Sequence, residues 1–220
     1  MRDRVFFASA FLLFFGSLSP ALFAQKKDEP RAYTLYPLSA KKQWTMEQTI
    51  YLDGKLQSGK RDIIFQVTRI TFGRCIRFPE VETSISGVAA EREVFSMFNP
   101  VEQGFSISLD EIKTPNPQTS VKFFPPVITI KSGMKPGQTW TWKGIEQIGK
   151  QKRRATRKFR AYGLEQIKTP AGEFKALSVE ETRPGIVTRT WYAPNVGIVK
   201  RTIRGGATKT VFLLSSPTTG

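Results

Sequence analysis

Three extended runs separated by proline- and glycine-containing spacers dominate residues 167–204. The runs are residues 174–182, 186–192 and 198–204, and all are rich in valine, isoleucine, threonine and aromatic residues. Such side chains fit the pleated surface of a sheet. Proline presets one backbone angle and glycine permits a positive one, so each spacer is expected to form a turn. The segment therefore predicts an antiparallel meander.

Extended runs with similar turn signals continue along the rest of the chain. An Asp53-Gly54 pair predicts a hairpin turn, Pro125-Pro126 predicts a connection, and residues 86–93 are the best candidate for one short helix. Regularly spaced strands predict an all-β fold, a curved antiparallel sheet that is half-barrel or barrel-like. The further expected strands are residues 44–52, 60–72, 75–83, 89–98, 105–112, 121–124, 128–130 and 138–148.

A weak internal repeat suggests that one domain, residues 25–220, consists of two similar halves. The segment that begins at Leu38 and contains Trp44 is similar to the segment from Met134 to Trp140. A second pair of similar segments follows in the same order, each an aromatic strand end closed by proline. The halves would span residues 31–130 and 131–215. Chance similarity between hairpins produces such matches easily, so one undivided domain is an equal alternative.

Residues 1–24 combine two early arginines, an apolar run over residues 5–15 and a terminal Ala24. A short basic region, an apolar stretch of roughly 7–15 residues and a small residue before the cut are typical of a secretory signal peptide. A membrane-spanning helix needs about 20 apolar residues, and Pro20 interrupts this stretch. The sequence therefore predicts an exported protein, periplasmic or secreted, that begins at Gln25.

The chain is strongly basic, with 34 Lys and Arg against 18 Asp and Glu and a formal net charge of +16. Most of the excess lies in residues 131–220, which hold 18 basic and 5 acidic residues. Positive charge attracts polyanions. An exported protein rarely meets nucleic acid, so lipid head groups, lipopolysaccharide phosphates or acidic polysaccharide are the expected partners, with peripheral membrane contact possible.

The chain has one cysteine, Cys75, which cannot form an internal disulfide. A sizeable apolar core must therefore hold the fold, and Cys75 is expected to be a small buried hydrophobe in it. Cys75 is also far from the expected cleavage point, so no lipid attachment at the new N-terminus is expected.

Two motifs carry a resemblance to a known family. TPAGEFKA at residues 169–176 and WYAPNVGIVK at residues 191–200 resemble the closing motifs of a family of exported bacterial β proteins of unknown function. Tyr36-Pro37-Leu38, followed by Trp44, is similar to that family's start. The resemblance covers most of the mature chain. It implies a curved sheet like those of lipid-carrier and half-barrel envelope proteins, and it brings no catalytic residues.

The absence of histidine excludes Ser-His-Asp and Cys-His catalytic arrangements and His-based metal sites. One cysteine cannot make a thiolate metal site. The carboxylates available for acid–base chemistry have a spacing that fits solvent-facing strand positions better than a catalytic pair. We therefore expect no enzyme activity, no metal and no cofactor. The carboxylates considered are Glu80, Glu82, Glu91, Glu93, Asp110, Glu111, Glu180 and Glu181.

The densest positive charge lies in residues 150–160, which read as one strand. Alternation places Arg153 and Arg157 on one face with Phe159, and the other basic residues on the opposite face. One interpretation is protection of a sheet edge, since lysine-rich edges prevent aggregation. The other is a binding site for an anionic partner. Its residues would be Lys150, Lys152, Arg153, Arg154, Arg157, Lys158 and Arg160.

The four tryptophans, Trp44, Trp140, Trp142 and Trp191, could line a ligand groove on a curved sheet or fill its core, and core is favoured. Together these features predict an exported, non-enzymatic envelope protein that binds an amphipathic or anionic ligand. The main alternative is a structural or assembly factor that docks another envelope protein through its basic face. A third is a carboxylate-dependent hydrolase of cell-wall sugars.

Overall fold

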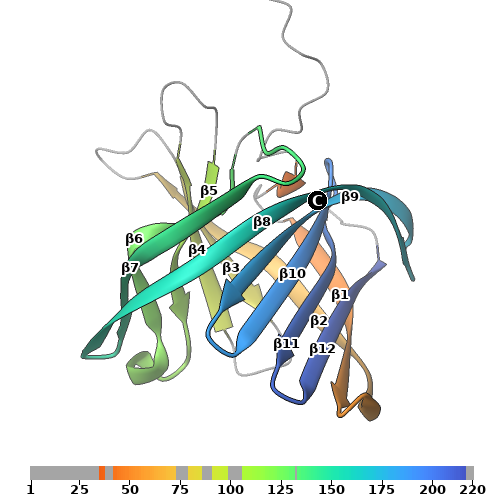
Figure 1. The fold of residues 1–220 in the computed structure, drawn as a ribbon, viewed down its shortest axis with the longest axis horizontal. Helices are drawn as coiled ribbons and strands as arrows, with labels where there is room; N and C mark the ends of the chain where they lie inside the picture. Colours follow the sequence, from red (N-terminus) through yellow and green to blue (C-terminus); the bar gives the residue numbers. More distant parts are fainter. Residues whose placement is uncertain are drawn as a thin grey trace, which may run out of the picture.

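The computed structural model describes residues 35–37, 42–72, 79–85, 91–98, 106–131 and 133–216. Within these ranges the chain is almost entirely antiparallel β-sheet, with a 3-10 turn η2 at Pro117–Thr119 (Figure 1). This confirms the all-β prediction. The described residues contain no helix long and apolar enough to cross a membrane. The expected signal peptide and Cys75 lie outside the described residues. The strands are β1 Gln43–Leu52, β2 Lys55–Phe72, β3 Pro79–Ile85, β4 Glu91–Phe98, β5 Ser106–Lys113, β6 Val121–Ile130, β7 Thr139–Ile148, β8 Gln151–Thr169, β9 Gly172–Arg183, β10 Ile186–Ala193, β11 Gly197–Gly205 and β12 Thr208–Ser216.

Each strand pairs with its neighbours in the sequence, and β1 pairs with both β2 and β12, so the strand order returns to its start. The result is the curved, barrel-like sheet that the sequence predicts. Hairpin turns make this order possible. Asp53 and Gly54, with φ of 47° and 75°, form the predicted turn between β1 and β2. The expected meander of residues 174–204 is β9, β10 and β11.

Three sequence-based expectations need correction. The expected break at Pro125-Pro126 is wrong, because β6 runs through both prolines as one strand. Residues 91–93 of the helix candidate begin β4, and residues 86–90 lie outside the described part of the chain. Strand β12 was not expected; Gly205-Gly206 and Thr208–Ser216 complete a hairpin whose threonine-rich sequence lacks clear alternation.

One cluster of buried apolar side chains forms the core. A short segment before β1 inserts into it, with the Tyr36 ring 5.4 Å from Trp44 and 5.9 Å from Tyr192. Trp44 also donates its indole N–H to the carbonyl oxygen of Val196 at 2.6 Å. A Cβ on Gly197, where φ is +105°, would lie 2.5 Å from the same indole nitrogen. Through these contacts β1 packs against the turn between β10 and β11.

The β6–β7 pair is hydrogen-bonded at one end only. The ladder runs from Val121↔Ile148 to Phe124↔Ile145, and the two prolines that follow have no N–H to donate. Beyond that point side chains connect the strands, because the indole N–H of Trp140 bonds to the carbonyl of Ile128 at 2.9 Å. The strands thus diverge into a groove of about 410 Å³. Its lining is Ser108, Pro125, Pro126, Ile128, Lys131, Trp140, Thr141 and Trp142.

Candidate functional site

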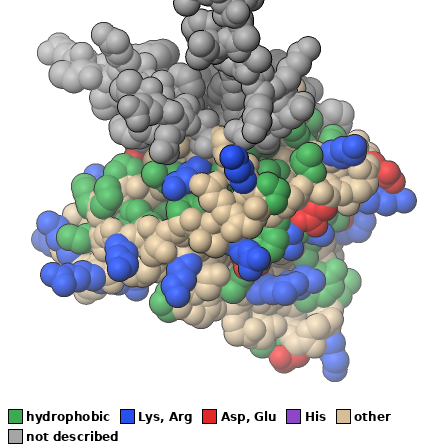
Figure 2. All heavy atoms as spheres, turned by 45° about the horizontal axis from the view of Figure 1, so that its top comes forward, with side chains coloured by type: hydrophobic (Ala, Val, Ile, Leu, Met, Phe, Trp, Pro, Cys, Tyr) green, Lys and Arg blue, Asp and Glu red, His purple; other side chains and the backbone are tan. Residues whose placement is uncertain are grey.

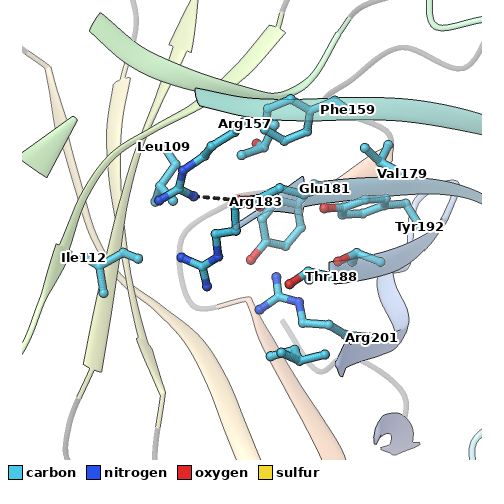
Figure 3. A pocket seen from close by; sticks show the side chains of 14 residues that line it. Leu109, Ile112, Arg157, Phe159, Val179, Glu181, Arg183, Thr188, Tyr192 and Arg201 are labelled. Atoms are coloured by element: carbon cyan, nitrogen blue, oxygen red, sulfur yellow. Dashed lines mark hydrogen bonds and ion pairs between the residues drawn. The ribbon is translucent and has the colours of Figure 1, made fainter. Parts of the chain in front are cut away.

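Strands β8 to β11 bring arginines from distant parts of the sequence to one cavity on the inner face of the sheet (Figure 3). Cross-strand neighbours share a face, and the register pairs Phe159 with Glu181 and Thr190 with Arg201. The cavity measures about 140 Å³. Apolar residues of β5, including Leu109 and Ile112, line its opposite side (Figure 3).

Arg157 is the most buried arginine of the cavity, with 4% of its surface exposed. Its guanidinium donates to Glu146 at 2.7 Å and to Glu181 at 2.7 Å. Arg153 binds the other carboxylate oxygen of Glu146 at 2.6 Å. The guanidinium of Arg157 also lies 4.5 Å from the centre of the Phe123 ring. Arg157 is therefore a structural cation, held by two carboxylates and an aromatic face.

Glu146 is equally buried, at 4% exposure. Burial pushes its pKa upward, but hydrogen bonds and charges from Arg157 and Arg153 outweigh this effect and hold the pKa below its usual 4.5. The carboxylate therefore stays ionised at neutral pH. Both Glu146 and Glu181 bind Arg157.

Arg183 and Arg201 are the other arginines of the cavity, and both side chains reach into it (Figure 3). The Nε of Arg183 is buried and has no hydrogen-bond partner among the described residues. Arg201 lies 5.8 Å from the centre of the Phe65 ring. Within the described lining, three arginines thus face one acid, Glu181. An arginine-rich, partly apolar cavity suits a small anionic group.

Sequence analysis missed Arg183 and Arg201 as site residues. Both carry a signal in the alternation of their strands. Arg201 lies between Val199 and Ile203 on the same side of β11, and Arg183 shares its side of β9 with Val179. In β11 a lone arginine in an otherwise apolar inward row indicates a charge that faces the interior, whereas in β9 the inward row that holds Arg183 also contains Glu181.

The predicted basic strand is the start of β8. One of its basic residues is buried and the others are exposed. Arg157 does not belong to an exposed anion-binding face, since its buried guanidinium is bound by Glu146 and Glu181; that part of the prediction is wrong. The predicted alternation is confirmed, because Phe159 is also buried. The remaining members, Lys150, Lys152, Arg153, Arg154, Lys158 and Arg160, are exposed.

In the described part of the chain, residues 151–157 pair with β7 alone, residues 158–160 pair with both β7 and β9, and the rest of β8 pairs with β9. The start of β8 therefore has an unpaired side, as edge protection requires. Basic side chains are spread widely over the face shown in Figure 2, with few acidic ones. Binding of an anionic partner to β8 stays a prediction.

Three of the four tryptophans are buried: Trp44, Trp142 and Trp191, at 1%, 6% and 6% exposure, whereas Trp140 is half-buried. Trp140 and Trp142 project from β7 toward β6 and line the groove between these strands. Phe159 connects groove and cavity, because it lines the cavity and stacks on Trp140 with 5.2 Å between ring centres. Within the described residues no cluster of three or more His, Cys, Asp or Glu could hold a metal ion.

No family model matches the chain, and no curated protein matches it. The solved structures to which the chain is similar include a candidate exported protein with a YmcC-like fold from Bacteroides fragilis, at 16% identity and a TM-score of 0.46 over 85% of this chain and 99% of that one. A candidate lipoprotein from Parabacteroides distasonis has 14% identity and a TM-score of 0.41 over 86% and 99% of the two chains. The hypothetical lipoprotein YmcC from Escherichia coli has 10% identity and a TM-score of 0.32 over 79% and 84%. The resemblance of the sequence motifs to one family stays a prediction.

Proposed function

We propose that this protein is exported and, without catalysing a reaction, binds an anionic amphipathic molecule of the cell envelope. The observation that carries the proposal is the cavity into which Arg183 reaches: the Nε of Arg183 is buried without a hydrogen-bond partner among the described residues, while the acids Glu181 and Glu146 bind Arg157. A buried N–H without an acceptor is costly. An anionic ligand supplies that acceptor.

The sizes of the two cavities suggest how an amphipathic molecule is divided between them. The inner cavity, at about 140 Å³, is small beside the roughly 300–1,000 Å³ of most ligand pockets, so it suits a head group alone. The groove between β6 and β7 is larger, about 410 Å³, and its prolines, Ile128 and indoles suit an apolar chain. Phe159 and Trp140 form the single aromatic layer between the two.

Export is supported by residues 1–24, which read as a secretory signal peptide. The absence of histidine and the engagement of Glu146 and Glu181 in ion pairs support binding rather than catalysis. A general acid or base needs a carboxyl group poised near the working pH, whereas the pKa of Glu146 is lowered.

The test compares two ligands that differ only in the head group, dodecanoate and dodecanol. Calorimetric titration of the purified protein should show tighter binding of dodecanoate. Arg183→Gln should weaken dodecanoate binding roughly tenfold or more, since a hydrogen bond to a charged group contributes about 1.5–3 kcal/mol. Dodecanol binding should be unchanged.

Lys143→Gln is the matched control, because Lys143 is an exposed cation on β7, outside both cavity linings. It removes the same charge and should leave dodecanoate binding unaffected. Equal affinity for the acid and the alcohol, or equal losses in the two variants, would contradict the proposal. If dodecanoate binds as expected, mass spectrometry of lipids that co-purify from a bacterial host would identify the natural anion.

A further inference from the structure

The outer face of the same strands carries a second cleft, of about 390 Å³, that the cavity does not reach. Alternation sets the two apart: Thr188 and Thr190 of β10 line the cavity, whereas Arg189 and Trp191 line the cleft. Four basic side chains from three strands surround it, against one acid, Glu180. The basic residues are Arg189 of β10, Lys200 and Arg204 of β11, and Lys209 of β12.

Trp191 forms the floor of the cleft between two cations. The Arg189 guanidinium and the Lys200 ammonium each lie 4.7 Å from the centre of its ring. Trp191 is only 6% exposed, and its buried indole N–H has no hydrogen-bond acceptor among the described residues. A buried indole usually finds a partner. Here the missing acceptor is an atom that a ligand could provide.

The charges around Trp191 are also incompletely balanced. Arg189 binds Glu165 and donates to the hydroxyl of Ser178 at 3.0 Å. Burial lowers the pKa of Lys200 below its usual 10.5; Glu165 opposes this, and the charges of Lys209 and Arg189 add to it. Burial and the two neighbouring cations thus disfavour the charged form of Lys200. A bound anion would relieve the repulsion from those cations.

We propose that this outer cleft binds a phosphate group, with the indole N–H of Trp191 and the side chains of Lys200, Arg204 and Lys209 as donors. A phosphate offers several acceptor oxygens in a tetrahedral arrangement, which suits donors that converge from different strands better than a planar carboxylate does. The site shares no lining residue with the inner cavity, so it stands independently of the function proposed above. The phosphate can belong to a lipid head group or be free in solution.

The decisive experiment uses calorimetric titration of inorganic phosphate into the purified protein at low ionic strength. The double variant Arg204→Gln, Lys209→Gln should lose roughly tenfold or more in affinity, since each cation near an anion contributes strongly. The control, Lys143→Gln with Lys175→Gln, removes the same charge from exposed positions outside the cleft and should change affinity less than about twofold. Equal losses in both double variants, or no binding of phosphate to the unmutated protein, would overturn the proposal.

Trp191→Phe separates a ligand contact from a packing role. It removes the unpartnered N–H and keeps an aromatic ring beside Arg189 and Lys200, so phosphate affinity should fall while the melting temperature changes little. A fall in melting temperature with unchanged affinity would remove Trp191 from the site.

Vesicles distinguish the two sources of phosphate. Displacement of phosphate by phosphatidylglycerol vesicles but not by phosphatidylcholine vesicles would assign a lipid head group; displacement by neither would assign the free ion.

Dodecanoate provides the internal check on independence. The variant Arg204→Gln, Lys209→Gln should bind dodecanoate like the unmutated protein, because both residues lie outside the inner cavity. Loss of dodecanoate binding with retained phosphate binding in this variant would overturn the assignment of the outer cleft. Failure of dodecanoate to bind any form of the protein would contradict the inner site alone.

Discussion

Trp142 donates its indole N–H to the carbonyl oxygen of Pro125 at 2.8 Å, beyond the last backbone pair between β6 and β7. Trp140 makes the equivalent bond to Ile128. Side chains thus hold together two strands that the prolines keep from pairing along their length. Gly144 lets them come this close, since a Cβ there would lie 2.5 Å from both the Phe124 carbonyl oxygen and the Trp142 ring.

We expect Trp142→Phe to lower the free energy of unfolding by about 0.5–1.5 kcal/mol, because the part-buried hydrogen bond from the indole to the Pro125 carbonyl is lost while an aromatic ring remains. Chemical denaturation measures this difference. Trp140→Phe is the matched comparison and should cost less, because Trp140 is half-buried whereas Trp142 is buried. Unchanged stability in Trp142→Phe would show that the indole bond does not hold the groove.

The lowered pKa of Glu146 predicts a specific loss of stability in acid. A carboxyl whose pKa is lower in the folded state stabilises the fold above its unfolded value, near 4.5. That contribution disappears as the pH falls through the folded pKa. Unfolding free energies measured from pH 6 down to pH 3 should therefore decline more steeply for the unmutated protein than for Glu146→Gln. Parallel declines in the two proteins would contradict the prediction.

Arg157→Met should be strongly destabilising, by about 3–5 kcal/mol, because it leaves Glu146 and Glu181 without their shared buried cation. The double variant Arg157→Met, Glu146→Gln should recover part of this loss, since one of the stranded charges is removed with it. A double-mutant cycle by denaturant unfolding measures the coupling. Strictly additive losses would show that the pair contributes little.

Gly197→Ala should destabilise more than Gly185→Ala. Both glycines have a positive φ, +105° and +73°, so alanine is strained at either, by about 1–2 kcal/mol. At Gly197 the added carbon also meets the Trp44 indole at 2.5 Å, whereas at Gly185 nothing lies within 4 Å. Melting temperatures of the two variants test the difference. Equal shifts would mean that the contact with Trp44 adds no constraint.

The basic residues on the exposed side of β8 can be tested for binding to an anionic partner, and such binding should depend on salt. Replacing Lys152, Arg154 and Lys158 with threonine should weaken binding to anionic vesicles by roughly 1 kcal/mol for each residue near the surface. The binding should also fade between about 0.1 M and 1 M salt, as the Debye length falls from about 10 Å to 3 Å. If vesicle binding is unchanged and aggregation increases, the charge serves edge protection instead.

The local order of strands and turns could be read from the sequence, because it depends on nearest neighbours. Val, Ile, Thr and aromatic runs specify β9 to β11, and Asp53-Gly54 specifies a tight turn, whatever the distant chain does. Alternation also placed Arg157 and Phe159 of β8 on the same face correctly. The unbroken course of β6 through Pro125-Pro126 could not be read in this way, since indoles of β7 provide the bonds that the prolines cannot.

The sites depended on register between strands that are far apart in the sequence. Arg157 looked like one member of a basic run, and only the pairing of β7, β8 and β9 brings Glu146 and Glu181 to it. The pairing of β9 to β12 likewise brings Arg183 and Arg201 to one cavity and gathers Arg189, Lys200, Arg204 and Lys209 around Trp191. The sequence by itself determined which side chains share a strand face. The tertiary structure decided which charges meet, because a shift of one residue between strands would reverse every face and separate every pair.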